Sequence, residues 1–293
     1  MPDLLARLRR PSGAFAMLAL DQREGLRTMM AGPALRDVSD AALSEFKVAA
    51  ARALTAAASA VLLDVAYGLG PVRAAGAIAP GCGLIVAADR LSQARGGPVE
   101  RTAVDEAVLA DDGIAAVADA YKLLVIWRRG EEAARAAVVS AFVAGCRRRR
   151  RGAIVEGIVR SADGTTLPGE AHAELVLEAA VELAALGADL YKAEVPTLGE
   201  ADDATIEDHA RGITDALPCP WVVLSNGTPP ARFDTAMLAA VRGGASGFLA
   251  GRAIWTESLA AADVPAHLAT VAAPRLAALG EAVDEAFAAH EES

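Results

Sequence analysis

Short apolar runs alternate with long helical patterns from one end of the chain to the other. The runs are rich in apolar and β-branched residues, which is typical of strands that a parallel sheet buries on both faces. Eight strands are predicted: Gly13–Leu20, Ala60–Asp64, Gly83–Ala88, Tyr121–Trp127, Ala153–Val159, Asp189–Val195, Trp221–Ser225 and Ser246–Ala250. This alternation predicts an α/β fold with a parallel sheet, and eight units predict closure into a (β/α)8 TIM barrel.

Helical periodicity fills the longer intervals between these strands. The predicted helices are Asp40–Ala58, Glu131–Arg148, Glu170–Leu186, Arg232–Arg242 and Pro274–His290. Ser39 is suited to cap the first helix, and Gly187 follows the last turn of the third. The segment Asp89–Ala120 is the least regular, and we expect a long loop and a helix there. No linker rich in Pro, Gly and Ser divides the chain, so residues 1–293 are predicted to form one domain.

The competing doubly wound fold requires a glycine-rich phosphate turn after its first strand. Here the first strand continues into ALDQREGLR, and the chain contains no G-x-G-x-x-G. The nearest candidate, Gly68-Leu-Gly70, has Arg73 where the third glycine belongs. The missing fingerprint favours the barrel.

Composition narrows the partners and the compartment. Apolar residues make up 54% of the chain, and the formal net charge of −10 argues against nucleic acid, which requires a basic face. Cys82, Cys146 and Cys219 lie far apart without a Cys-x-x-Cys pair, which indicates a reducing compartment. No secretory signal is visible, and no charge-free apolar run reaches about 18 residues. We therefore expect a cytoplasmic protein that has no membrane partner.

Polar side chains stand at the end of almost every predicted strand, where barrels of this type carry their chemistry. They are Asp21-Gln22-Arg23, Asp64, Asp89, Arg128, Glu156 with Arg160, Lys192 with Glu194, Ser225-Asn226-Gly227, and Gly251-Arg252.

Lys192 is the strongest candidate among them for a catalytic residue. In the run LYKAE, Lys192 and Glu194 share one face of a strand, about 6.5 Å apart. Burial and a neighbouring cation, for which Lys122 is a candidate, both lower the pKa of an ammonium group, as an attacking amine requires near neutrality. A purely structural Lys–Glu ion pair remains open as the alternative.

Glu156 lies among apolar residues in AIVEGIV and is a candidate for general acid–base catalysis. Its alternative is an ion pair with Arg160 or Lys122 that has no chemical role. Histidines occur in helical stretches without metal-ligand spacing, so no metal site is predicted and an amine mechanism is favoured over a metal one. The run Arg147–Arg151 is expected in solvent at a helix C-terminus.

The last two strand ends predict an anion site. Ser225-Asn226-Gly227 and Gly251-Arg252 combine small residues with a hydroxyl and a guanidinium group, and many barrels bind phosphate after strands 7 and 8. The backbone N–H groups there and a helix N-terminus add donors.

At these residues the chain resembles a known family. FAMLALDQREGLR, SAVLLD, IVAAD, KLLVIWR, GADLYKAEVP, PWVVLS and GASGFLAGRAIW are similar to class I aldolases that comprise tagatose-1,6-bisphosphate aldolase and sulfofructosephosphate aldolase. The resemblance covers nearly the whole chain and is closest to the sulfofructosephosphate branch, on DQRE, the strand ending in WR, and VEGIVR.

The resemblance implies a metal-independent enzyme with no cofactor, in which Lys192 forms a Schiff base and Glu156 transfers protons, with Glu194 as its rival. It places Asp21, Gln22, Arg23 and Lys122 around the sugar, and Ser225, Gly227, Gly251 and Arg252 at the phosphate. Arg23 and Arg128 are then expected to meet the sulfonate, on neighbouring strand ends across the barrel from Gly251-Arg252.

Two departures from the family bear on the substrate. Asn226 replaces a small residue, and Ala66 in DVAYG replaces an acid found in the tagatose branch, which this segment otherwise resembles. The leading hypothesis is 6-deoxy-6-sulfofructose-1-phosphate aldolase, which gives dihydroxyacetone phosphate and 3-sulfolactaldehyde. Tagatose- or fructose-1,6-bisphosphate aldolase and a non-catalytic sugar-phosphate sensor remain as alternatives. A homo-oligomer, dimer or tetramer, is expected.

Overall fold

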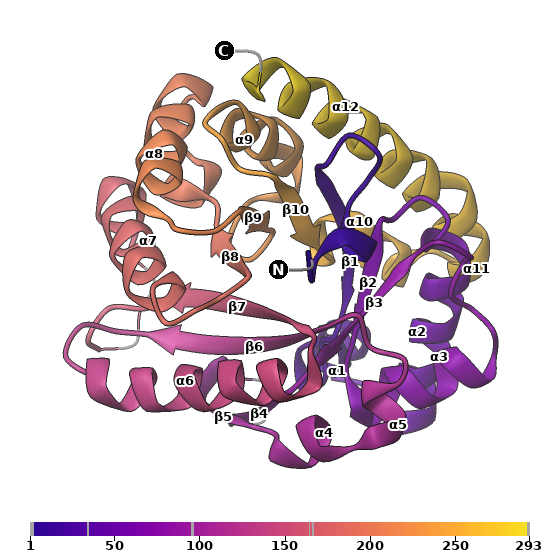
Figure 1. Ribbon diagram of the computed structural model, residues 1–293. Coiled ribbons are helices and arrows are strands. Elements are labelled where there is room, and N and C mark those ends of the chain that lie inside the picture. Colours follow the sequence, from indigo (N-terminus) through magenta and orange to yellow (C-terminus); the bar gives the residue numbers. More distant parts are fainter. Residues whose placement is uncertain (1–2, 34, 95–96, 164, 166, 292–293) are drawn as a thin grey trace.

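Eight parallel strands close into a barrel in the computed structural model, which describes residues 3–33, 35–94, 97–163, 165 and 167–291 (Figure 1). Around the barrel they follow the order β1-β10-β9-β8-β7-β6-β3-β2. Their bounds are β1 Phe15–Leu20, β2 Ala60–Leu63, β3 Gly83–Ala87, β6 Ala120–Trp127, β7 Gly152–Val159, β8 Leu190–Glu194, β9 Trp221–Leu224 and β10 Gly247–Ala250. The predicted (β/α)8 barrel and its eight strands are confirmed, within one or two residues at each end.

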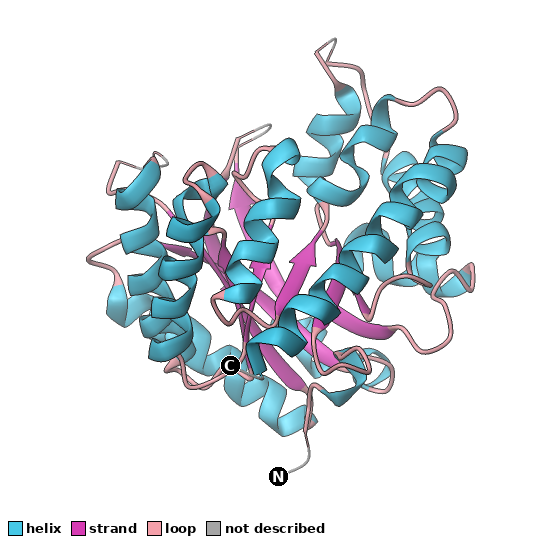
Figure 2. Cartoon of the chain, turned by 90° about the horizontal axis from the view of Figure 1, so that it is seen from above, coloured by secondary structure: helices cyan, strands magenta, loops and turns pink. Residues whose placement is uncertain are grey.

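Helices surround the strands on the outside (Figure 2). They are α1 Glu24–Ala31, α2 Asp40–Leu54, α3 Gly70–Ala74, α4 Glu106–Ala110, α5 Asp112–Ala115, α6 Glu132–Arg149, α7 Gly169–Ala184, α8 Asp203–Ala216, α9 Pro230–Arg242, α10 Arg252–Trp255, α11 Val264–His267 and α12 Ala273–Glu291. The five predicted helices correspond to α2, α6, α7, α9 and α12. Ser39 caps α2 as predicted, because its hydroxyl accepts a hydrogen bond from the Ala42 N–H at 3.2 Å.

The barrel closes because β1 pairs with both β2 and β10. Leu18 lies opposite Val61 on one side and opposite Ala250 on the other. Inward side chains such as Phe15, Met17 and Leu190 fill the lower part of the barrel as a packed core. Leu5 and Leu8, around the 3-10 turn Ala6–Leu8, pack against that core from the N-terminal end.

The segment 89–120 departs from the prediction of a long loop and a helix. It contains an antiparallel hairpin, β4 Asp89–Gln93 with β5 Val99–Val104, followed by the short helices α4 and α5. Alternating buried and exposed positions in β4 are a strand signal. Only one face of this two-stranded hairpin is covered, so most of its residues are polar. The strand therefore lacks the continuous apolar run that marks the barrel strands in the sequence.

Candidate active site

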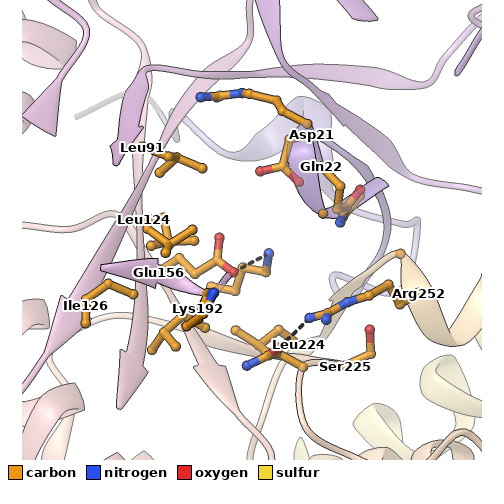
Figure 3. Close-up of a pocket in the computed structure, with 18 of the residues that line it drawn as sticks. Asp21, Gln22, Leu91, Leu124, Ile126, Glu156, Lys192, Leu224, Ser225 and Arg252 are labelled. Atoms are coloured by element: carbon orange, nitrogen blue, oxygen red, sulfur yellow. Dashed lines mark hydrogen bonds and ion pairs between the residues drawn. The ribbon is translucent and has the colours of Figure 1, made fainter. Parts of the chain in front are cut away.

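A cavity of about 300 Å³ opens where the barrel strands end (Figure 3). Eight of the candidate residues line it: Asp21, Gln22, Arg23, Glu156, Lys192, Ser225, Gly251 and Arg252. Lys122, Arg128, Glu194 and Gly227 are not among its lining residues. The polar strand ends are thus gathered at one site, as expected for a barrel with chemistry at the C-terminal ends of its strands.

Lys192 is a buried amine directly beside a carboxyl group. Its Nζ lies 3.0 Å from Oε1 of Glu156, and its side chain is 5% exposed, so the amine reaches the cavity. The pairing follows from sheet register, because Glu156 of β7 lies opposite Lys192 of β8 and both side chains point inward. Such a pair can attack a carbonyl and exchange protons with the adduct.

Lys122 occupies the other side of Glu156. Its Nζ lies 3.1 Å from Glu156 Oε2, 2.6 Å from Asp21 Oδ2 and 2.9 Å from Asp89 Oδ2. Burial alone lowers the pKa of Lys122, but these three carboxylates outweigh it and hold this pKa well above its ordinary value. Lys122 is therefore a fixed cation that orients Glu156 beneath the cavity.

Asp21 completes this network from β1. Burial raises its pKa, but Lys122 and then Lys192 oppose that effect and hold the pKa of Asp21 well below its ordinary range. Asp89 binds Arg23 as well, since Arg23 donates to its backbone oxygen at 2.8 Å and to Oδ1 at 2.6 Å. Asp21, Asp89 and Glu156 thus face the cations Lys122, Lys192 and Arg23.

Glu194 is held away from Lys192, although both side chains leave the same face of β8. Its Oε2 accepts from the Val159 N–H at 2.8 Å, and its Oε1 accepts from Asn226 Nδ2 at 2.7 Å. His172 of α7, fully buried, lies 3.6 Å from Oε2. These contacts fit a residue that positions Asn226, and Glu156 is the carboxyl group in contact with the amine.

The predicted anion site lies on the side of the cavity formed by β9, β10 and the residues after them. Arg252 donates to Asn226 Oδ1, and the Ser225 hydroxyl lies 3.5 Å from the Ala253 N–H. A Cβ at Gly251 would lie 2.2 Å from the Ala19 oxygen, so only glycine fits there. Gly227 has φ +79° and lies outside the cavity lining, where it shapes the turn after β9.

The prediction that Arg23 and Arg128 leave neighbouring strand ends across from Arg252 is wrong for Arg23, whereas β6, the strand before Arg128, does lie opposite β10. β1, before Arg23, lies between β2 and β10, whereas β6, before Arg128, lies between β3 and β7. Because the last strand of a barrel pairs with the first, Arg23 comes from the strand next to β10. Arg128 is half-buried, and its Nε has no hydrogen-bond partner among the described residues.

The comparisons with known proteins identify the family and support the fold. A model of the DeoC/LacD family of aldolases matches residues 15–257. The chain belongs to this family. Among solved structures, an archaeal fructose 1,6-bisphosphate aldolase is 18% identical with a TM-score of 0.67, over 96% of this chain and 98% of that one. The fructose-bisphosphate aldolase of Plasmodium falciparum is 15% identical with a TM-score of 0.70, over 97% and 92%.

A third structure describes reaction intermediates of a Schiff-base-forming fructose-1,6-bisphosphate aldolase. It is 17% identical with a TM-score of 0.62, over 96% of this chain and 98% of that one. At such identities the likeness concerns the barrel. Together with the family match and the buried lysine in the cavity, it makes this DeoC/LacD protein a class I aldolase, a lyase of carbon–carbon bonds.

Several residues of the aldolase site escaped the sequence analysis. Asp89 was recognised only as a polar strand end, yet it binds both Lys122 and Arg23. Arg160 was recognised as a polar strand end and as a possible partner of Glu156, yet it lines the cavity and makes no ion pair with Glu156. Leu91 and Val99 line the cavity from the hairpin, which was not predicted.

Three other expectations concern an exposed arginine run, a metal site and a membrane-spanning helix. The run Arg147–Arg151 was expected in solvent at a helix C-terminus, and α6 does end at Arg149, with Arg147, Arg148 and Arg150 exposed. Arg147 also binds Asp189, and Arg149 and Arg151 donate to backbone oxygens of the segment 109–115. No group of His, Cys, Asp and Glu side chains that could hold a metal ion occurs within the described part of the chain. No described helix is long and apolar enough to cross a membrane.

Proposed function

We propose that the aldolase cleaves a ketose 1-phosphate reversibly through a Schiff base on Lys192. The observation that carries this proposal is the buried Lys192 amine, 3.0 Å from Glu156 Oε1 at the floor of the cavity. Ser225, Gly251 and Arg252 line the same cavity and supply donors for a phosphate. The covalent lysine replaces any separate cofactor in this proposal.

In the proposed reaction, the Lys192 amine attacks the C2 carbonyl of the ketose and forms a carbinolamine. Glu156 protonates the departing hydroxyl, which leaves as water and yields the iminium ion. Glu156, now a carboxylate, takes the proton of the C4 hydroxyl, the C3–C4 bond breaks, and its electron pair enters the enamine as the aldehyde departs. Protonation at C3 and hydrolysis release dihydroxyacetone phosphate. Lys122 holds Glu156 in place throughout, at 3.1 Å.

The leading substrate is 6-deoxy-6-sulfofructose 1-phosphate, which would yield dihydroxyacetone phosphate and 3-sulfolactaldehyde. Its support is the resemblance on DQRE, WR and VEGIVR. Asp21, Gln22 and Arg23 would contact the sugar hydroxyls, since all three line the cavity and Gln22 Oε1 has no hydrogen-bond partner among the described residues. Such an enzyme serves sulfoquinovose degradation.

Tagatose- or fructose-1,6-bisphosphate is the second candidate, favoured by the similar structures, which are fructose-bisphosphate aldolases. A sensor without turnover is the third, and the paired Lys192 and Glu156 weigh against it. The deciding experiment measures kcat/KM for sulfofructose 1-phosphate, tagatose 1,6-bisphosphate and fructose 1,6-bisphosphate on one preparation. We expect the highest value for the sulfonate. A higher value for either bisphosphate would replace the leading substrate, and no turnover of any would favour the sensor.

Three further expectations accompany the proposal. The acidic chain, with three cysteines that form no disulfide, fits the cytoplasm. We also propose that residues 1–293 fold as one domain and that the aldolase forms a dimer or tetramer. Light scattering after size exclusion tests the assembly, and a monomeric mass would contradict it.

A further inference from the structure

The side of the cavity away from Arg252 is built differently from the anion side. Figure 3 shows Arg252 and Ser225 on one side, Leu124 and Ile126 on the other, and Glu156 with Lys192 between them. Leu124 and Ile126 on that side belong to an apolar cluster with Ile158, Val99 and Leu224, which extends along the cavity toward β9. The part of a substrate beyond the reacting bond therefore meets a largely apolar surface.

Arg160 is the cation on the side of the cavity away from Arg252. Among the described residues that line the cavity, the cations are Arg23, Arg160, Lys192 and Arg252. Arg23 is bound to Asp89, and Lys192 is paired with Glu156. Arg160 follows β7, and β9 and β8 separate that strand from β10, so Arg160 comes from nearly the opposite side of the eight-stranded barrel to Arg252.

The guanidinium of Arg160 makes one described hydrogen bond and can donate further N–H groups to a ligand. Its Nη1 donates to its neighbour's backbone oxygen, that of Val159, at 2.6 Å, and lies 3.8 Å from Glu194 Oε1. A guanidinium carries five N–H donors in a planar fork that matches a three-oxygen anion. Its side chain is 14% exposed, so an anion bound there would lose most of its water.

Glu194 and the apolar cluster near Arg160 limit the charge that an anion bound to Arg160 can carry. Arg160 supplies one positive charge, part of which Glu194 offsets from 3.8 Å, and the neighbouring cluster is apolar, so the second charge of a dianion would be left without a counter-charge. A sulfonate carries one permanent charge, whereas a phosphate monoester at pH 7 carries close to two. On the basis of the proposed function, we infer that Arg160 binds the group ending the aldehyde half of the ketose, and that this group is a monoanion.

The test compares ketose 1-phosphates that differ only at this end: fructose 1-phosphate (neutral), sulfofructose 1-phosphate (monoanion) and fructose 1,6-bisphosphate (dianion). In Arg160→Gln we expect kcat/KM for the sulfonate to fall about tenfold or more, the scale of a lost charge-assisted hydrogen bond, mainly through KM. Fructose 1-phosphate should change less than about twofold. Arg160→Lys keeps the charge and should recover part of the sulfonate activity.

Arg129→Gln is the matched control, because Arg129 forms an exposed pair with Glu178 and lies outside the cavity lining. Borohydride trapping with dihydroxyacetone phosphate reports on each variant's fold and amine, and Arg160→Gln should be trapped like the wild type. Equal losses on all three ketoses, or a sulfonate-specific loss in Arg128→Gln instead, would overturn the inference and leave the proposed function intact. A wild type that is not trapped would overturn the proposed function itself.

Discussion

The aldolase buries lysine beside carboxylate at two places in the barrel. At β2, Lys47 of α2 forms an ion pair with Asp64, and both side chains are fully buried. At β6, β7 and β8, Lys122 and Lys192 share Glu156, with Asp21 and Asp89 on Lys122. Asp64 and Lys47 are absent from the described lining of the cavity, whereas Lys192 and Glu156 are part of it.

The pKa values of Lys47 and Lys122 are shifted in opposite directions. Burial lowers the pKa of Lys47, because one carboxylate, Asp64, does not compensate for the lost water. Three carboxylates reverse that effect at Lys122. A lowered pKa alone therefore does not mark an amine as reactive, because the fully buried Lys47 cannot be reached by a substrate. Access to the cavity, together with a proton-transfer group in contact, is what distinguishes Lys192.

Lys192→Met carries the largest expected effect. Without the amine no Schiff base forms, and we expect cleavage to fall on the order of 10⁴-fold or more, the scale of losing a covalent nucleophile. Steady-state cleavage of the best ketose phosphate measures it. Residual activity within about tenfold of wild type would show that another group is the nucleophile.

Lys47→Met should affect stability and leave the chemistry unchanged. The substitution leaves Asp64 as a buried charge without a partner, so the free energy of unfolding should fall by about 3–5 kcal/mol, measured by urea denaturation. The folded fraction should retain trapping by dihydroxyacetone phosphate. Loss of trapping with stability preserved would remove the distinction between the two clusters.

Glu156→Gln keeps the shape of the side chain and removes its proton transfer. We expect dihydroxyacetone phosphate to bind still, and turnover to slow by at least about a hundredfold. Single-turnover kinetics separates the effect on binding from the effect on turnover. Turnover at the wild-type rate would move the role to Glu194, despite its bonds to Val159 and Asn226.

Asp21→Asn tests the charge state of the network. The pKa of Asp21 is lowered on folding, so its contribution is complete above its unfolded value of about 3.9 and is lost as the pH falls through the folded value. The pKa of Lys122 is raised, so its contribution is complete below about 10.4. The variant should be destabilised by roughly 1–3 kcal/mol, equally at pH 5 and pH 8. A loss that shrinks at pH 5 would show that the pKa of Asp21 is not lowered.

Chelation should have no effect. The lysine amine activates the carbonyl in this account, and the described residues hold no cluster suited to a metal ion. Cleavage measured before and after dialysis against EDTA should agree. Complete loss that a divalent ion restores would contradict the amine mechanism.

The sequence predicted the barrel well because its signals are local. Strand-length apolar runs recur between helices, and caps such as Ser39 mark where helices begin. It also predicted that Lys192 and Glu156 belong to one site, since both occupy inward positions near strand ends. The hairpin β4–β5 was missed because its polar residues lack the apolar run of a barrel strand.

Which side chains contact each other in the site was harder to predict from the sequence, because these contacts depend on how the barrel closes and how far each side chain reaches. Closure brings Arg23 beside β10, which a linear list of strands does not convey. Glu194 shares a face with Lys192, but its side chain turns to Val159 and Asn226. The sequence left both Arg160 and Lys122 open as ion-pair partners of Glu156. In the structure Lys122 is that partner, and Arg160 lines the cavity.

The most direct test of the account is to identify which lysine becomes modified. The aldolase is incubated with dihydroxyacetone phosphate, reduced with borohydride, digested and examined by mass spectrometry. We predict that the mass of the reduced ligand is added to the peptide that contains Lys192, whose Nζ contacts Glu156 in the cavity. An adduct on Lys122 or Lys47, or none at all, would contradict the assignment of Lys192 as the Schiff-base amine.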